Sequence, residues 1–159
     1  MSVAVSVATS PAALFDALRA SPSLARRALR EPATAVAIVL LVEDDGHCRA
    51  GLRRQLIRAG FDVCEAANGL EALHLLRRRR VDVLATDIRM PTMSGLALLD
   101  ALAGDLPDLP VVAYSGAHLL DPEICARLAA RHVPLLHKPF PPEVLVAALR
   151  DAIKRSDPR

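Results

Sequence analysis

Acidic, hydroxyl and amine side chains follow directly after short apolar segments at four places in this sequence. Glu43 and Asp44 follow the first of these segments, and Asp87, Ser115 and Lys138 follow later ones. Three carboxylates gathered at one point repel one another. A hard divalent cation such as Mg²⁺ relieves that repulsion because it prefers oxygen ligands. If the fold brings the four places together, the sequence predicts a metal-assisted site.

The residue types in this set suit phosphoryl transfer. Mg²⁺ in proteins keeps several waters and binds through one or two carboxylates together with phosphate oxygens. A lysine opposite the metal balances charge on an incoming phosphoryl group, and a remaining carboxylate can act as the nucleophile and become an acyl phosphate. Metal and lysine together stabilise the equatorial oxygens during the transfer.

The apolar segments alternate with helical patterns from about residue 37 onward. The uninterrupted apolar run 37–42 is typical of a strand buried on both faces. The predicted strands are 37–42, 61–66, 81–86, 110–114 and 133–137, and a helix is expected after each of them. Five such units predict an α/β fold, a doubly wound parallel sheet with helices on both faces. Functional groups in these sheets gather at the carboxyl ends of the strands.

The first 35 residues do not fit this repeat. They carry a weak helical pattern that Ser21-Pro22 interrupts. We therefore expect residues 1–35 to be an N-terminal extension, helical or partly disordered, and residues 36–159 to form one domain. The composition suits a packed core, with 52% apolar residues, but aromatic residues make up only 3%. The core must therefore be built from Leu, Val, Ile and Ala.

Charge and hydropathy argue against several classes of partner. The net charge of +2 does not indicate nucleic acid, and the run Arg77–Arg80 is interpreted as a solvated helix end. No apolar run reaches about 18 residues, so no membrane span is predicted. The three cysteines lack metal-ligand spacing, and buried thiols in a reducing cytoplasm are expected.

Four motifs, each placed at a strand end, resemble the receiver domain of bacterial two-component response regulators (CheY-like). The resemblance covers roughly residues 37–155. It is carried by Leu41-Val42-Glu43-Asp44-Asp45, by Thr86-Asp87-Ile88-Arg89-Met90-Pro91-Thr92-Met93-Ser94-Gly95, by Tyr114-Ser115-Gly116 and by His137-Lys138-Pro139-Phe140. The resemblance implies a flavodoxin-like (βα)5 fold with strand order 2-1-3-4-5.

The resemblance also implies a role for each acidic residue. Asp87 matches the phosphoacceptor. Asp44 matches the direct Mg²⁺ ligand, and Glu43 matches its acidic neighbour, acting through water. The backbone carbonyl of Arg89 would complete the metal ligands that the protein supplies.

Further roles follow for the last two strand ends. Lys138 matches the lysine that pairs with phosphoryl oxygens, and Ser115 matches the switch hydroxyl. The Lys138–Pro139 peptide bond is expected to be cis. The donor would be a phosphohistidine on a sensor histidine kinase or a phosphotransfer protein. The chain would act by protein contact on a downstream protein, with no output domain of its own, and would not be an enzyme apart from self-dephosphorylation.

Two alternatives and one departure stay open at this point. A Mg²⁺-dependent phosphohydrolase would share the aspartyl nucleophile, but it typically has a general acid where this chain has Arg89. A degenerate receiver would act only as a binding module. The family often has Tyr or Phe at the position of Leu135, and leucine cannot provide the same inward turn of a ring. The usual readout through the fourth helix and fifth strand is therefore in doubt.

Overall fold

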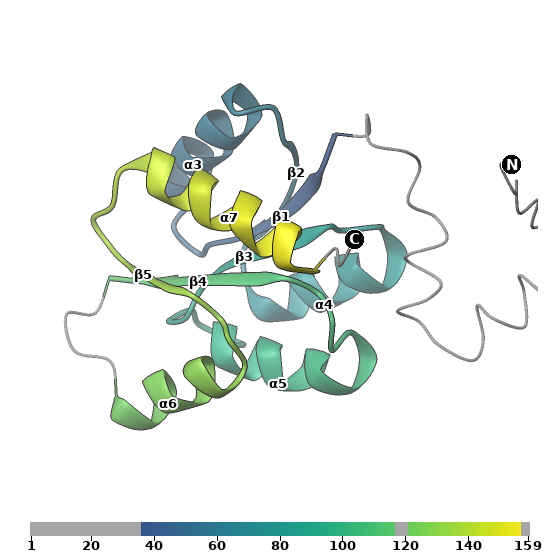
Figure 1. Cartoon of the computed structure of the whole chain (residues 1–159), viewed down its shortest axis with the longest axis vertical. Helices are drawn as coiled ribbons and strands as arrows, with labels where there is room; N and C mark the ends of the chain where they lie inside the picture. Colours follow the sequence, from purple (N-terminus) through teal and green to yellow (C-terminus); the bar gives the residue numbers. More distant parts are fainter. Residues whose placement is uncertain (1–35, 117–120, 157–159) are drawn as a thin grey trace, which may run out of the picture. The chain divides into compact units, whose positions relative to one another are not determined.

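The computed structural model describes residues 36–116 and 121–156 (Figure 1), so the predicted extension over residues 1–35 lies outside the described part. The strands are β1 (Ile38–Val42), β2 (Asp62–Ala66), β3 (Val83–Asp87), β4 (Val111–Ser115) and β5 (Leu135–His137). The helices are α3 (Gly46–Arg58), α4 (Gly69–Arg78), α5 (Gly95–Asp105), α6 (Pro122–Ala130) and α7 (Pro142–Ser156). None of the helices in these two ranges is both long and apolar enough to cross a membrane.

The five strands pair in parallel in the order β2-β1-β3-β4-β5. This confirms the predicted doubly wound sheet and its strand order. The order reverses between β1 and β3, because the chain passes from β1 outward to β2 and then returns to the other side of β1. Val42 pairs with Thr86 across this boundary. The residues that follow β1 therefore lie beside the end of β3, where ligands bind in open α/β sheets.

Side chains alternate between the two faces of the sheet and form a separate core on each face. One core joins Leu40 and Leu84 to α4, α5 and α6, and the other joins Leu41 and Val83 to α3 and α7. Figure 1 shows α3 and α7 on one side of the sheet and the other three helices on the opposite side. The strands β1 and β3 are buried on both faces, so the ends of these strands have a rigid support.

Four of the helices follow a residue whose side chain caps the first turn. The Asp45 carboxylate accepts a hydrogen bond from the Cys48 N–H at 2.7 Å, as an N-cap residue does. Asn68 and Ser94 cap α4 and α5 in the same way, and Asp121 caps α6 by accepting from the Glu123 N–H. Asp45 thus belongs to the start of α3, which leaves Glu43 and Asp44 as the acids between β1 and the helix.

The last strand is shorter than predicted, since it begins at Leu135 and not at residue 133. The Val133 N–H donates to the Leu128 carbonyl at 2.9 Å and so closes the end of α6. Pro134 has no N–H to contribute to a strand ladder. The apolar character of residue 133 therefore reflects packing after a helix and not membership of the sheet.

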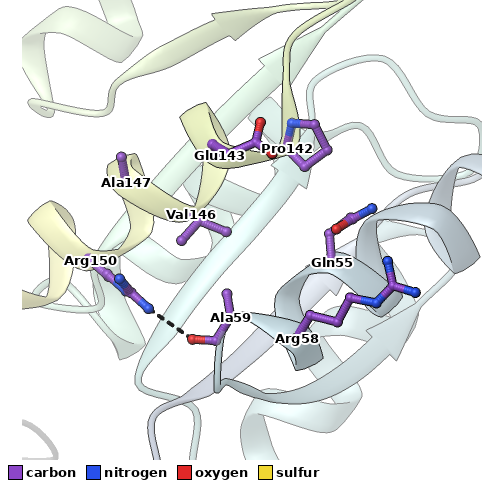
Figure 2. A pocket seen from close by; sticks show the side chains of 8 residues that line it. All are labelled: Gln55, Arg58, Ala59, Pro142, Glu143, Val146, Ala147 and Arg150. Atoms are coloured by element: carbon purple, nitrogen blue, oxygen red, sulfur yellow. Dashed lines mark hydrogen bonds between the residues drawn. The ribbon is translucent and has the colours of Figure 1, made fainter.

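A hollow of about 450 Å³ lies between α3 and α7 (Figure 2). Its lining consists of Gln55, Arg58, Ala59, Pro142, Glu143, Val146, Ala147 and Arg150. The Arg150 guanidinium donates to the Ala59 carbonyl at 2.9 Å and links the two helices across it. The lining residues of α3 come from the end of the helix away from Asp44. This hollow is therefore separate from the predicted chemical groups.

Candidate functional site

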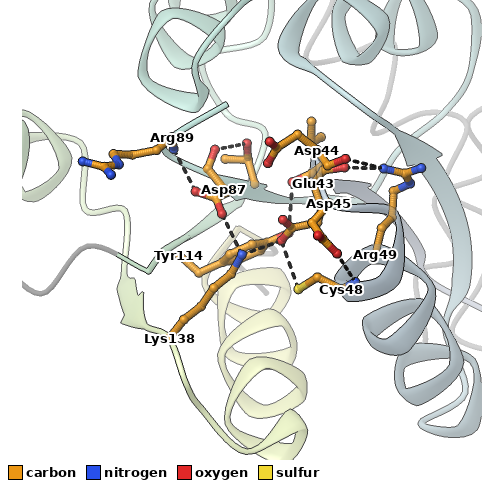
Figure 3. Close-up of polar contacts among 11 residues, drawn as sticks. Glu43, Asp44, Asp45, Cys48, Arg49, Asp87, Arg89, Tyr114 and Lys138 are labelled. Carbon is orange, nitrogen blue, oxygen red and sulfur yellow. Dashed lines mark hydrogen bonds and ion pairs between the residues drawn. The ribbon is translucent and has the colours of Figure 1, made fainter. Parts of the chain in front are cut away.

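The predicted chemical groups converge at the carboxyl ends of β1, β3, β4 and β5. Figure 3 shows four of them, Glu43, Asp44, Asp87 and Lys138. Glu43 and Asp44 follow β1 directly. Asp87 and Ser115 are the last residues of β3 and β4, and Lys138 is the first residue after β5. Parallel strands present their carboxyl ends at one edge of the sheet, so residues far apart in the sequence meet there.

The three acids form one cluster with unequal exposure. One carboxylate oxygen each from Glu43, Asp44 and Asp87 lies within 4.8 Å of the others. Glu43 and Asp87 are buried, with 1% and 6% of their surface exposed, whereas Asp44 is exposed. The cluster therefore has a buried base formed by two acids and an open side formed by the third.

Lys138 links the two buried acids. Its ammonium donates to Glu43 Oε2 at 2.6 Å and to Asp87 Oδ2 at 2.7 Å. Burial alone would lower the pKa of Lys138, but the hydrogen bonds and negative charges of Asp87 and Glu43 outweigh burial and raise it. The lysine therefore stays charged between the carboxylates. Its peptide bond to Pro139 is cis.

The second oxygen of Asp87 is held by the loop that follows β3. Asp87 Oδ1 accepts a hydrogen bond from the Arg89 N–H at 2.8 Å, while the Arg89 side chain points away from the cluster (Figure 3). The Gly95 N–H donates to the Ile88 carbonyl at 3.1 Å, which folds the loop back against β3. Both oxygens of Asp87 thus have a donor, and its carboxylate has a defined orientation.

Gly95→Ala is expected to destabilise the fold because the loop passes too close to β3. A Cβ at this position would lie 2.1 Å from the carbonyl oxygen of Asp87 and 3.0 Å from the Thr86 hydroxyl. We expect a loss of about 3 kcal/mol in the free energy of unfolding, as for overpacking of a core. Urea unfolding followed by circular dichroism measures it.

Gly51→Ala is the matched control for this change. Gly51 lies in α3, and a Cβ there would have no neighbour within 4 Å. Because alanine favours a helix interior, this variant is expected to be more stable by about 0.5–1 kcal/mol. Equal stability of the two variants would show that the loop at Gly95 relaxes at no cost.

Two residues at the site carried no chemical signal in the sequence. Tyr114 is fully buried beside the cluster, and its hydroxyl donates to the Val42 carbonyl at 2.9 Å. Arg49, one turn into α3, donates to the Glu43 carbonyl at 2.6 Å and forms an ion pair with Glu65. The only hint to Tyr114 in the sequence was a tyrosine within an otherwise aliphatic strand. The contact of Arg49 with the Glu43 carbonyl depends on the angle at which α3 leaves β1.

The prediction of buried thiols is wrong for all three cysteines. Cys125 is exposed on α6, and Cys48 and Cys64 are half-buried; all three are free thiols. An apolar residue type does not by itself reveal which face of a short helix it occupies.

Cys48 contacts the site, since its thiol lies 3.4 Å from Glu43 Oε2. Burial, followed by the negative charge of Glu43, raises the pKa of Cys48 to about 11.

Alkylation by iodoacetamide at pH 8 is expected to be much slower at Cys48 than at Cys125. The thiolate is the reactive form, and a pKa of about 11 in place of 9.0 reduces its fraction at pH 8 by about 100-fold. The rate at Cys48 should still rise between pH 9 and pH 11. Peptide mass spectrometry over a time course measures each rate, and unfolding in urea should equalise the three cysteines. Equal rates in the folded protein would contradict the contact with Glu43.

Leu135 lies at the start of β5 and packs against the core beneath α4, α5 and α6. Its side chain is half-buried. An aromatic ring does lie at the site, because the Tyr114 ring of β4 is 4.9 Å from the Lys138 ammonium. The aromatic group at this site is therefore on β4, whereas receiver domains often carry an aromatic residue at the position of Leu135 on β5.

Curated proteins similar to this chain are response regulators. The sequence pattern of the response regulator receiver domain matches residues 39–150. Response regulator MprA of Mycobacterium tuberculosis H37Rv is 35% identical over 120 residues, which make up 76% of this chain and 52% of MprA. Transcriptional regulatory protein PrrA of Mycobacterium bovis is 36% identical over 117 residues, or 74% of this chain and 50% of PrrA. The chain spans about half the length of these relatives.

Solved structures agree with this match. The chemotaxis protein CheY4 of Vibrio cholerae is 30% identical, with a TM-score of 0.67 over 74% of this chain and 99% of that one. A CheY-like receiver domain protein of Methanospirillum hungatei shares the fold, with a TM-score of 0.70, 20% identity and coverage of 77% and 97%. Since the family match extends from β1 into α7, this chain belongs to the response regulator receiver domains, which are phosphoacceptor signalling modules.

Proposed function

We propose that this chain takes a phosphoryl group onto Asp87 with Mg²⁺ as cofactor. The observation that carries the proposal is the position of the Asp87 carboxylate, which is buried, lies within 4.8 Å of two further acids and is bound by Lys138. A carboxylate oxygen of Asp87 attacks phosphorus, the bond from phosphorus to the donor breaks, and the donor group leaves. The product is an acyl phosphate.

The acidic cluster fits a hard divalent cation. Asp44 and Asp87 are proposed as direct ligands together with the Arg89 carbonyl, and Glu43 as an acid that acts through water. Three carboxylate oxygens within 4.8 Å offer only hard oxygen donors, and the exposed side at Asp44 leaves room for waters and phosphate oxygens. When bound, Mg²⁺ supplies positive charge to the transferring phosphoryl group.

Lys138 and Ser115 are proposed to bind the phosphoryl group after transfer. Lys138 already contacts Asp87 Oδ2, so its ammonium is next to the oxygens of a group attached there. Ser115 ends β4, and its carbonyl accepts a hydrogen bond from the Lys138 N–H at 2.8 Å. A hydrogen bond from the Ser115 hydroxyl to the phosphoryl group would link phosphorylation to movement of β4.

The proposed donor is a phosphohistidine of a sensor histidine kinase or a phosphotransfer protein. The surface of the described residues has both positive and negative side chains. Some of them form ion pairs, such as those of Asp100 with Arg127 and Arg131. We propose that residues 36–159 form the receiver and that residues 1–35 are an extension of it. The phosphorylated chain then acts through contact with a downstream protein. Water attacks phosphorus, the bond from phosphorus to the Asp87 oxygen breaks, and inorganic phosphate leaves, which restores the Asp87 carboxylate.

Intact-mass spectrometry after incubation with Mg²⁺ and acetyl phosphate tests the proposal. We expect one added phosphoryl group per chain, removed by base or hydroxylamine as an acyl phosphate is. EDTA should abolish the reaction, because the cluster then lacks its cation.

Other outcomes would separate the alternatives. Continued release of phosphate from added phosphomonoesters over many turnovers would favour the Mg²⁺-dependent phosphohydrolase. Absence of both modification and Mg²⁺ binding would favour a receiver that acts only as a binding module.

A further inference from the structure

Tyr114 connects three of the strands that form the site. It lies on β4, directly before Ser115, and it is the only tyrosine of the chain. The strand β3 lies between β4 and β1 in the sheet. The Tyr114 hydroxyl nevertheless donates to the Val42 carbonyl at the end of β1, at 2.9 Å. The side chain therefore crosses β3 and joins strands that are not neighbours, about two strand spacings apart.

The hydroxyl of Tyr114 remains a donor under ordinary conditions. Burial, followed by the negative charge of Glu43, raises the pKa of Tyr114 well above 10. The proton therefore stays on the phenol, and the hydrogen bond to Val42 persists. Val42 directly precedes Glu43 and Asp44, so this hydrogen bond restrains the backbone from which both acids project.

The ring of Tyr114 supports Lys138. The ammonium of Lys138 lies 4.9 Å from the ring centroid, within the range of a cation–π contact. The ring is held in place by an edge contact with Phe140, whose centroid is 5.8 Å away at an angle of 65°. In Figure 3 the Lys138 ammonium lies next to the Tyr114 side chain. Ring and hydroxyl thus act on different members of the site.

We infer that Tyr114 is a positioning residue for phosphoryl acceptance: its hydroxyl orients Glu43 and Asp44 through Val42, and its ring holds the Lys138 ammonium beside Asp87. This inference rests on the proposed function at Asp87. Two substitutions separate the two contacts. Tyr114→Phe keeps the ring and removes the hydroxyl, whereas Tyr114→Leu removes both.

Each variant is expected to change a different kinetic parameter. For Tyr114→Phe, the Mg²⁺ concentration that gives half-maximal phosphorylation by acetyl phosphate should rise about 3- to 10-fold, the range of one hydrogen bond. The maximal rate should stay within about 2-fold. For Tyr114→Leu, the maximal rate should also fall by about 10-fold, because the ammonium loses the ring beneath it.

Lysine NMR provides a readout that does not require phosphorylation. The chain has two lysines, Lys138 and Lys154, so lysine labelled with ¹³C at Cε gives two assignable signals. The Lys138 signal should be shifted by the ring current in the wild type and in Tyr114→Phe. The shift should be absent in Tyr114→Leu. Val112→Ala, a loss of side chain on the same buried face of β4, is the structural control. It should lower stability and leave both the Lys138 signal and the Mg²⁺ dependence unchanged.

Specific results would overturn the inference. An unchanged Mg²⁺ dependence in Tyr114→Phe contradicts the role of the hydroxyl, and an unchanged Lys138 signal in Tyr114→Leu contradicts the role of the ring. Changes of equal size in Val112→Ala would show a general effect of stability. If the wild type accepts no phosphoryl group, the proposed function fails, and the lysine spectra still test the contact between Tyr114 and Lys138.

Discussion

Asp87→Asn is expected to abolish phosphorylation by acetyl phosphate. An amide has no anionic oxygen with which to attack phosphorus, whereas its shape matches that of the carboxylate. The hydrogen bond from the Arg89 N–H to Oδ1 can therefore be retained. The contact of Lys138 with Asp87 Oδ2 would be to a neutral group, while its contact with Glu43 remains. Intact-mass spectrometry at saturating Mg²⁺ measures the loss, and thermal unfolding shows that the variant is folded.

Asp100→Asn is the matched control. This acid lies on α5, where it forms ion pairs with Arg127 and Arg131 of the α6 region at the surface. The same chemical change there should leave phosphorylation unaltered. Asp44→Asn is expected to behave differently from both, because it should raise the Mg²⁺ requirement and still permit modification. Full modification of Asp87→Asn would place the nucleophile at another residue, which peptide mapping would identify.

Lys138→Met is expected to slow phosphorylation by about 100-fold or more, the usual effect of removing a group that stabilises the transferring charge. Methionine keeps much of the apolar stem and removes the ammonium. Glu43 and Asp87 are then two buried carboxylates without their shared cation. We expect a loss of about 3 kcal/mol in the free energy of unfolding at neutral pH. Mg²⁺ should restore part of this loss, because it supplies positive charge to the same acids.

The pH dependence of this stability difference has a definite sign. The pKa of Lys138 is raised: burial opposes the charged form, but Asp87 and Glu43 favour it more strongly. A group whose pKa is raised on folding contributes its full stabilisation of the folded state at a pH below its ordinary pKa, which is 10.5 for lysine. That contribution is lost as the pH rises through the pKa of the folded state. The difference between wild type and Lys138→Met should therefore stay constant from neutral pH to about pH 10 and shrink only above it.

Lys154→Met tests whether these effects are specific to Lys138. Lys154 is the other lysine of the chain and is exposed in the last turn of α7. Its replacement should change stability by no more than about 0.5 kcal/mol and leave phosphorylation intact. Urea unfolding with and without Mg²⁺ measures both variants. Equal behaviour of the two would argue against a role for Lys138 in the acidic cluster.

The architecture and the main chemical groups could be predicted because their signals are local. An uninterrupted apolar run marks a strand that is buried on both faces, and the residue after such a run lies at a strand end. This reasoning located Glu43, Asp44, Asp87 and Lys138 at the edge where the structure brings them together. The parallel sheet and its order followed from the alternation of strands and helices together with the family resemblance.

Other features depend on contacts between distant segments, and no local pattern encodes these. Lys138 contacts Glu43 across 95 positions of the sequence, and Tyr114 contacts Val42 across 72. The choice of Glu43 as the buried partner of the lysine, with Asp44 exposed, follows from the direction in which the chain leaves β1. The close approach of Gly95 to the Asp87 carbonyl and the exposure of Cys125 likewise depend on how the elements pack.

Residue type and order along the chain were thus sufficient to predict which chemical groups form the site and at which edge of the sheet they lie. The tertiary structure decided which of these groups touch, which are buried, and that a tyrosine from β4 lies beneath Lys138. The physical reason is that hydrogen bonds and charge pairs act over a few ångströms. Their partners are therefore set by packing in space, whereas strand and helix patterns are set by neighbours in the sequence.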